Sequence, residues 1–256
     1  MRKTLFIITF FIMIPLLINS QVSIIAHRGA SWLAPENTVA ASRLAWDLGA
    51  DAVECDIWLS KDNRIICIHD ATTKRTTGED FRVSETDSET LRKLDAGSFK
   101  DEKYRGEKLP FLHELIKAVP KGKELVVEIK CGAEVLPFLV STINKYEKNR
   151  VFSFISFNFD VIAETKKLFP SKKCYWLCSN AALLESTIGI VPDAGLDGIS
   201  LNFSIINDEV MKKASSLGLD VYSWTVDKPE EAKRLITLGV KGITTNRPGW
   251  LEEQMR

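Results

Sequence analysis

The stretch VECDIW, residues 53–58, has the composition of a buried β-strand but carries two acidic residues. Successive side chains of a strand point to opposite faces, so Glu54 and Asp56 share one face and Cys55 lies on the other. At a separation of about 6–7 Å, two negative charges repel each other by roughly 2–3 kcal/mol. Either this face is open to solvent, or a divalent cation, which prefers oxygen ligands, binds between the two carboxylates.

Similar short runs rich in β-branched residues recur along the chain, and amphipathic helical patterns separate most of them. The predicted core strands are Ser23–Ala26, Ala52–Trp58, Glu124–Lys130, Val151–Ser156, Cys174–Cys178, Gly198–Leu201, Val221–Val226 and Gly242–Thr245. The predicted helices are Thr38–Leu48, Glu134–Tyr146, Val161–Leu168, Ala181–Ile188, Asp208–Leu217 and Pro229–Leu238. Eight strand–helix units in about 230 residues predict an α/β protein with one (β/α)8 TIM barrel. An open doubly wound sheet is disfavoured because no GxGxxG follows the first strand.

One further strand-like run interrupts this alternation. Residues 64–68 follow Trp58 too closely for a helical crossover, so we expect a hairpin with the strand at 52–58 through the turn SKDN. Residues 70–110 are then polar, charged and rich in turn formers. We interpret residues 70–110 as a small subdomain inserted in the loop after this hairpin, because the strand–helix pattern resumes directly afterwards.

The first twenty residues differ in kind from the rest of the chain. Two basic residues precede an apolar stretch at positions 5–18, which is shorter than the about 20 residues that span a bilayer. This pattern predicts a signal peptide over residues 1–20 with cleavage near Gln21, and the alternative is an uncleaved N-terminal anchor. We therefore expect residues 21–256 to form a secreted or periplasmic protein with no stable membrane insertion after cleavage.

Composition narrows the classes of partner. The formal net charge is zero and there is no basic tract, so nucleic acid is not an expected partner. The five cysteines lie in or beside apolar runs, and their spacing does not match a zinc site. We interpret them as small buried side chains, and the alternative is one disulfide between two that the fold brings together.

Reactive side chains concentrate where the predicted strands end, which is where barrel active sites lie. The first strand is followed by His27 and Arg28 in IIAHRGA, and the hairpin strand by His69 in ICIHD. In ELVVEIK, Glu128 and Lys130 share one face of an apolar strand. Each feature alone has an ordinary structural explanation, but their coincidence at one end of one barrel favours an active site.

Two further residues, an aromatic and a histidine, are considered for this site. Trp224 in YSWTVD also lies on a predicted strand, where alone it would be read as part of the core. His113 in PFLHEL opens a helix away from the strand ends, so we leave it outside the candidate site.

The chemistry that fits these residues is cleavage of a phosphodiester. Glu54, Asp56 and Glu128 can hold one Ca²⁺ or Mg²⁺ and leave positions open for water and substrate oxygens. Arg28 and Lys130 supply the positive charge that a phosphate needs as negative charge builds up in the transition state. The two histidines at the strand ends can share the acid and base roles near neutral pH.

The sequence also resembles a known family. The pieces HRG, PENT, GADAVECD, HD and RTTG, within residues 27–78, look like the N-terminal signature of glycerophosphodiester phosphodiesterases. The resemblance continues through LDAGSF, LPFLHEL, VVEIK, ISFN and YSWTV, and so covers nearly all of residues 21–256. It implies a TIM barrel that binds one divalent cation, Ca²⁺ or Mg²⁺, and hydrolyses a small glycerophosphodiester to sn-glycerol 3-phosphate and an alcohol.

The positions that match the functional residues of this family coincide with those found at the strand ends. They are the metal ligands Glu54, Asp56 and Glu128, the catalytic His27 and His69, the phosphate-binding Arg28 and Lys130, and Trp224 in the substrate pocket. Residues 70–110 match the inserted subdomain of the family. The last strand departs from the pattern: where the family commonly has Thr-Asp-x-Pro, this chain has Asn246 in place of Asp, which removes a charge expected at the pocket rim.

We therefore expect a metal-dependent phosphodiesterase that acts on substrates such as glycerophosphocholine or glycerophosphoethanolamine by two-histidine acid–base catalysis. One alternative is a phospholipase D-like or lysophospholipid-cleaving enzyme on the same barrel. The other is a non-catalytic barrel that binds a phosphate or sugar, which the presence of every expected metal ligand and both histidines disfavours.

Overall fold

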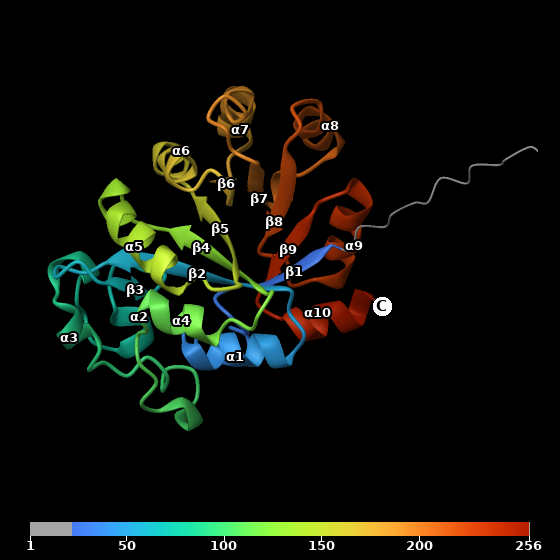
Figure 1. The fold of residues 1–256 in the computed structure, drawn as a ribbon. Helices are drawn as coiled ribbons and strands as arrows, with labels where there is room; N and C mark the ends of the chain where they lie inside the picture. The colour runs from blue at the N-terminus through green and yellow to red at the C-terminus, as the bar shows by residue number, and fades with distance from the viewer. Residues whose placement is uncertain (1–21, 256) are drawn as a thin grey trace, which may run out of the picture.

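Eight parallel strands form a closed barrel inside a ring of helices in the computed structural model, which describes residues 22–255 (Figure 1). The barrel strands are β1 (Ser23–Ala26), β2 (Ala52–Leu59), β4 (Glu124–Ile129), β5 (Val151–Ser156), β6 (Lys173–Cys178), β7 (Gly198–Asn202), β8 (Asp220–Trp224) and β9 (Gly242–Thr245). They follow one another around the barrel in chain order, and β9 pairs with β1 to close it. The predicted (β/α)8 barrel is confirmed, whereas the predicted signal peptide, residues 1–20, lies outside the described residues.

Eight helices within the described residues surround the barrel. They are α1 (Val39–Asp47), α4 (Leu112–Ala118), α5 (Leu136–Tyr146), α6 (Phe159–Leu168), α7 (Ala181–Thr187), α8 (Asp208–Ser216), α9 (Pro229–Leu238) and α10 (Pro248–Met255). Four of them, α1, α6, α7 and α8, begin at a residue whose side chain caps the first turn. The side chains of Asn158, Asn180 and Asn207 accept hydrogen bonds from backbone N–H groups in the first turns of α6, α7 and α8. Helix α10 was not predicted, because it is short and buries few apolar side chains. None of the helices within residues 22–255 is long and apolar enough to cross a membrane.

The strand β3 (Ile65–Cys67) pairs antiparallel with β2, as the hairpin prediction required. Between β3 and α4 lie the short helices α2 (Lys74–Thr77) and α3 (Ser88–Leu91) and the 3₁₀ turns η1 (Val83–Glu85) and η2 (Glu102–Tyr104). This segment packs around its own hydrophobic cluster, made of Ile66, Ile68, Val83, Leu91, Leu94, Ala96 and Leu109. Figure 1 shows α2 and α3 beside β3, on the side of the barrel that β2 borders.

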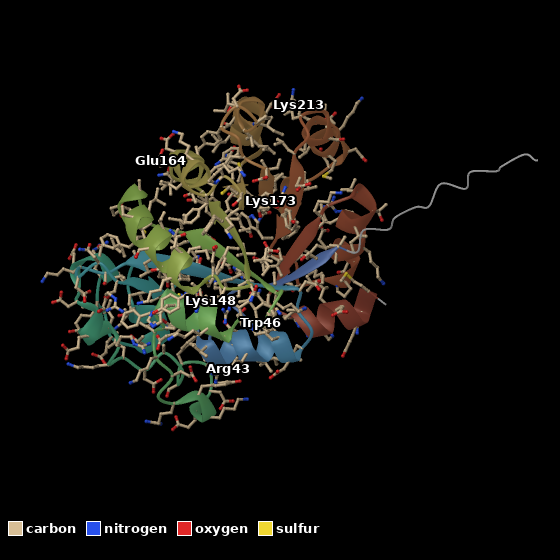
Figure 2. All side chains as sticks on the ribbon, viewed as in Figure 1. Arg43, Trp46, Lys148, Glu164, Lys173 and Lys213 are labelled. Carbon is tan, nitrogen blue, oxygen red and sulfur yellow. The ribbon has the colours of Figure 1, made fainter. Side chains whose placement is uncertain are left out.

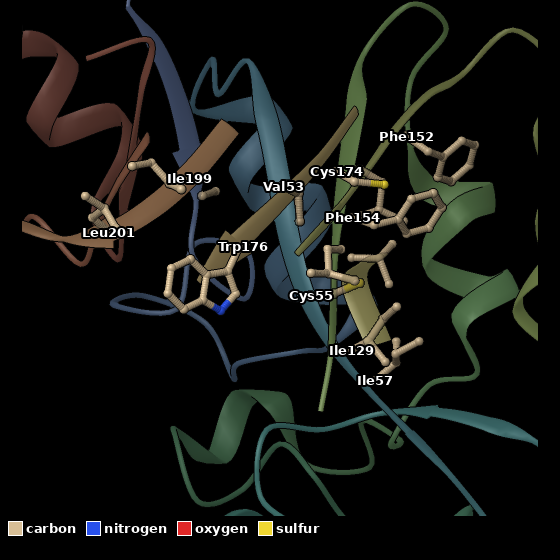
Figure 3. Packing of buried hydrophobic residues seen from close by; sticks show 14 of the residues in the cluster. Val53, Cys55, Ile57, Ile129, Phe152, Phe154, Cys174, Trp176, Ile199 and Leu201 are labelled. Atoms are coloured by element: carbon tan, nitrogen blue, oxygen red, sulfur yellow. The ribbon is translucent and has the colours of Figure 1, made fainter. Parts of the chain in front are cut away.

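Alternation along the strands separates two apolar layers. Outward-facing side chains such as Cys55, Phe154 and Trp176 pack beneath the helices, and each is at most 2% exposed (Figure 3). Burial of each large side chain contributes roughly 1.5–3 kcal/mol. A smaller cluster, which includes Ile155 and Leu177, fills the barrel interior. Charged side chains, such as that of the exposed Lys213 on α8, project from the helices into solvent (Figure 2).

The cysteines belong to these apolar layers. All five are free thiols, and four of them are fully buried. The fifth, Cys131, lies half-buried just after β4. Their interpretation as small buried side chains is confirmed for the four, and no disulfide joins any pair within residues 22–255.

Candidate active site

One cavity at the carboxyl end of the barrel collects most of the predicted site residues. Its volume is about 150 Å³. Seven of the eight predicted residues line it: His27, Arg28, Glu54, His69, Glu128, Lys130 and Trp224. The eighth, Asp56, is fully buried beside Glu54 and Glu128. The residues converge because parallel strands all end at the same rim of a barrel.

The three carboxylates form a compact buried cluster. Asp56 on β2 lies directly opposite Glu128 on β4, and Glu54 precedes Asp56 on the same strand face. One oxygen from each lies within 4.8 Å of the others, and the residues are 1%, 0% and 7% exposed for Glu54, Asp56 and Glu128. The solvated-surface interpretation of VECDIW is therefore wrong. Burial and then the charges of Asp56 and Glu128 raise the pKa of Glu54 well above its ordinary value.

The cluster has the donor set of a divalent cation site. Burial and the charge of Asp56 raise the pKa of Glu128 to about 7, although Lys130 opposes this shift. Oxygens Oε1 of Glu54 and Oδ1 of Asp56 are buried without any hydrogen-bond partner, and such an orphaned acceptor costs about 1–3 kcal/mol or more. Three hard oxygen ligands, two of them with unsatisfied lone pairs, fit Ca²⁺ or Mg²⁺.

Arg28 is fixed against this cluster through its backbone as well as its side chain. Its N–H donates to Oε2 of Glu54 at 2.9 Å, and its Nε lies 3.2 Å from Oδ2 of Asp56. The residue adopts a left-handed φ of 56°, which is uncommon outside glycine. The following Gly29 has φ 82°, and a Cβ there would lie 2.6 Å from the backbone of Ala41. The HRG motif is thus a backbone requirement as well as a set of functional groups.

Lys130 connects the carboxylates to one histidine. Its Nζ donates to Oε1 of Glu128 at 2.8 Å and lies 3.7 Å from Oδ1 of Asp56. The same Nζ lies 3.1 Å from Nε2 of His69. Although burial opposes it, the charges of Glu128 and Asp56 raise the pKa of Lys130, so the ammonium stays charged.

His69 has a carboxylate partner and a further charged network behind it. Its Nδ1 lies 2.7 Å from Oδ1 of Asp70, and Arg75 on α2 donates to Asp70 at 2.6 Å. Arg75 also donates to Glu36 at 2.7 and 2.8 Å, and Arg28 donates to the same carboxylate at 2.9 Å. Burial opposes ionisation of Asp70, but hydrogen bonds from Arg75 and His69 lower its pKa to about 2. Asp70 is therefore a permanent anion beside the ring.

His27 has a neutral partner instead. Its Nδ1 lies 2.7 Å from Oδ1 of Asn246, while Nδ2 of Asn246 donates to Oδ2 of Asp227 at 2.6 Å. Because the amide donates to Asp227, it presents its oxygen to the ring, so Nδ1 of His27 carries the proton and Nε2 keeps its lone pair. Burial, followed by the charge of Arg28, lowers the pKa of His27 to about 4. The ring is neutral at pH 7.

Asn246 follows β9 and contacts His27, which lines the cavity, and its amide nitrogen donates to the Asp227 carboxylate. The sequence did not predict either contact. Asp227 also accepts from the Thr245 hydroxyl at 2.9 Å and from the Asn246 N–H at 2.8 Å.

Several supporting residues were missed from the sequence. Asn37, in the quoted PENT, donates to Oδ2 of Asp56 at 2.8 Å and accepts from the Asp56 N–H at 3.0 Å. Phe157 lines the cavity and meets Trp224 edge-on at 5.4 Å between ring centroids. The period of two along β5 predicts that Phe157 faces inward like Ile155, and that signal was available. His113 stacks on neighbouring rings and does not line this cavity.

Comparisons with known proteins cover the whole site. The model of the glycerophosphoryl diester phosphodiesterase family matches residues 27–250. The glycerophosphodiester phosphodiesterase of Caldanaerobacter subterraneus subsp. tengcongensis is 35% identical over 238 residues, which cover 91% of this chain and 97% of that protein. A glycerophosphodiester phosphodiesterase of Bacillus subtilis is 28% identical over 252 residues, covering 91% of this chain and 86% of that protein. A phosphodiesterase of Oleispira antarctica, solved with the product sn-glycerol-3-phosphate, has a TM-score of 0.84 and 28% identity, covering 91% of this chain and 96% of that one.

Proposed function

The chain belongs to the glycerophosphoryl diester phosphodiesterase family, and from that premise we propose a metal-dependent, two-histidine hydrolysis of glycerophosphodiesters to sn-glycerol 3-phosphate and an alcohol. The enzyme is a phosphoric diester hydrolase with a small-molecule substrate. The observation that carries the proposal is one cavity in which His27 and His69 face a buried carboxylate cluster beside Arg28 and Lys130.

Glu54, Asp56 and Glu128 are the residues that would hold the cation. A bound divalent ion supplies positive charge that polarises the phosphate and stabilises charge developing on its oxygens. Ca²⁺ is the first candidate and Mg²⁺ the second, because an exported protein encounters more Ca²⁺ outside the cytoplasm than it would inside. The orphaned oxygens of Glu54 and Asp56 are the features of this chain that support a cation of either kind.

Arg28 and Lys130 bind the phosphate. Both side chains line the cavity and remain charged, since the pKa of each is raised above its ordinary value by neighbouring carboxylates, against the effect of burial. In the structure Lys130 donates to His69, so a phosphate oxygen competes with that ring for the ammonium. Binding of the phosphate thus frees Nε2 of His69 to take up a proton from solvent, and this is the proton that the ring then gives to the departing alcohol oxygen.

His27 is the base and His69 the acid. Nε2 of His27 accepts the proton of the attacking hydroxyl, from water or from a glycerol hydroxyl, as that oxygen bonds to phosphorus. The bond from phosphorus to the alcohol oxygen breaks, and that oxygen takes a proton from Nε2 of His69. The Asp70 carboxylate is the electrostatic match for a ring that carries two protons, whereas the amide of Asn246 is the match for a neutral one.

We also propose that the protein is exported, either secreted or periplasmic, and cleaved near Gln21. The support is the sequence alone: two basic residues, a short apolar stretch and a polar end within residues 1–20. N-terminal sequencing of the exported protein tests this, and a membrane-bound product that still begins with Met1 would contradict it.

A coupled release assay tests the proposed function. The enzyme, treated with chelator and resupplied with Ca²⁺ or Mg²⁺, should release sn-glycerol 3-phosphate from glycerophosphodiesters and little from a detergent-solubilised lysophospholipid. Release from the lysophospholipid alone would favour the lipid-cleaving alternative, and no release from any diester would refute the proposal.

A further inference from the structure

The reaction cavity is too small for a whole diester, and a second cavity adjoins it. The reaction cavity, lined by His27 and His69, has a volume of about 150 Å³, whereas a typical ligand pocket has about 300–1,000 Å³. The second cavity, of about 540 Å³, shares Glu128, Lys130 and Phe157 with it. We call this second cavity the side groove. Its remaining walls include Trp58 from β2 and Glu134 from the turn before α5.

The side groove begins next to the proposed acid. Nε1 of Trp58 donates to the backbone oxygen of His69 at 3.1 Å, and Nζ of Lys130 lies 3.1 Å from the His69 ring. His69 protonates the departing alcohol oxygen, so the rest of that alcohol extends from this side of the reaction cavity. The groove is therefore placed to receive the alcohol.

The walls of the groove have the chemistry of a cation site. Phe157 is 46% exposed and Trp58 is half-buried, so both rings are accessible to a ligand. Glu134 is an exposed carboxylate whose Oε1 accepts from the Gly132 N–H at 3.0 Å. Over the described range 22–255, no cationic side chain forms an ion pair with Glu134, whereas Lys130 is already held by Glu128 at 2.8 Å.

We propose that the side groove binds a cationic amino alcohol, such as the choline or ethanolamine part of the substrate. Trp58 and Phe157 pack against the ammonium group, and Glu134 supplies the opposite charge. An anionic alcohol would instead meet repulsion from Glu134. This inference rests on the proposed function, because it assigns a place to the alcohol that His69 releases.

Binding of the alcohol alone tests the groove independently of turnover. Choline and its uncharged isostere 3,3-dimethylbutan-1-ol are titrated by NMR against the full enzyme and against Glu134→Gln, which keeps an oxygen for the Gly132 N–H. Choline should bind the variant up to about fivefold more weakly, the factor that corresponds to about 1 kcal/mol, the upper end for an exposed ion pair, and the isostere equally well. The control Glu185→Gln, an exposed carboxylate on α7 outside both cavities, should change neither. Equal binding of choline to all three proteins would overturn the proposal.

Kinetic measurements distinguish a failure of the side-groove proposal from a failure of the proposed phosphodiesterase activity. The ratio of kcat/KM for glycerophosphocholine to that for glycerophosphoglycerol, whose alcohol is neutral, should fall by up to about fivefold in Glu134→Gln and stay constant in Glu185→Gln. Hydrolysis of both substrates with an unchanged ratio would refute the groove and leave the phosphodiesterase intact. Failure to hydrolyse either would refute the proposed function, and the choline titration would still decide whether the groove binds a cation.

Discussion

The two histidines of the site lie in unlike regions of one barrel. His27 follows β1 and is held by Asn246 at the end of β9, so its surroundings belong to the barrel strands. His69 follows β3 and is held by Asp70, which Arg75 of the segment between β3 and α4 secures. A neutral amide faces one ring and a carboxylate faces the other. In the proposed mechanism, this difference in environment, rather than residue type, divides the base from the acid.

This comparison also gives the segment between β3 and α4 a role in the chemistry. Arg75 on α2 binds Asp70 and Glu36 together, and Glu36 in turn binds Arg28. Burial opposes ionisation of Glu36, but hydrogen bonds and charge from Arg75 and Arg28 lower its pKa to about 2. The network therefore stays ionised near neutral pH and joins His69, the proposed acid, to Arg28, the proposed phosphate ligand.

Removal of the cation should lower activity more than any other change, because the cation would serve the surroundings of His27 and of His69 alike. Excess chelator should abolish measurable activity and lower the thermal midpoint, and a resupplied divalent ion should restore both, since a ligand that binds only the folded state stabilises it. Glu54→Ala should reproduce both effects by weakening metal affinity. Activity assays and thermal melts with and without Ca²⁺ measure this, and full activity in excess chelator would contradict the metal site.

Replacing either histidine should lower kcat less than removal of the cation does, and the two replacements should lower it by similar factors. His27→Ala and His69→Ala should each lower kcat by roughly 10²–10⁴, the usual contribution of general acid–base catalysis. Both variants should keep the wild-type thermal midpoint within a few degrees, because the rings lie at strand ends and not in the hydrophobic layers. A His27 variant that simply unfolds would show that this histidine is structural.

Exchanging the partners of His27 should shift its pH dependence. In the double variant Asn246→Asp with Asp227→Asn, a carboxylate would contact the ring, and opposite charge raises a histidine pKa above the value of about 4 that it has beside Asn246. A base works only when deprotonated, so the acidic limb of kcat/KM should move to higher pH. The single variant Asn246→Asp sets two carboxylates at a 2.6 Å contact and should lose about tenfold in kcat, which the double variant recovers. An unmoved limb would contradict the role of Asn246.

The third histidine should have the smallest effect and serves as the control. His113 stacks on Phe111 and Tyr146 at centroid distances of 5.6 and 5.3 Å, outside the reaction cavity. His113→Ala should leave kcat within about twofold and lower the unfolding free energy by about 1 kcal/mol through lost stacking. A kcat loss equal to that of His27→Ala would show that position at a strand end does not distinguish the catalytic histidines.

The barrel and the main site residues could be predicted from sequence because both follow from local patterns. The period of two places Glu54 and Asp56 on one face, and parallel strands carry their last inward residues to one rim. The partners that tune these groups could not be predicted in the same way. The contact between His27 and Asn246 joins residues 219 positions apart, and no local pattern fixes which polar group meets which ring.

The same limit applies to the network around Arg75 and to the side groove. Arg75 and Glu36 are 39 positions apart, and each alone reads as a surface charge. The sequence pattern predicts Glu134 only as the first residue of a helix, whereas in the structure it lies in the turn η3 (Ala133–Val135) and lines the side groove. Side-chain partners across a fold depend on packing geometry, which a single sequence does not contain.

The division of labour between the two histidines is tested most directly by the leaving group. A glycerophosphodiester whose alcohol is replaced by p-nitrophenol needs no proton on the departing oxygen, because p-nitrophenolate is already a stable anion. With this substrate, His69→Ala should recover to within about tenfold of wild-type kcat, whereas His27→Ala should keep its loss of roughly 10²–10⁴. Recovery of His27→Ala in place of His69→Ala would reverse the assignment of base and acid.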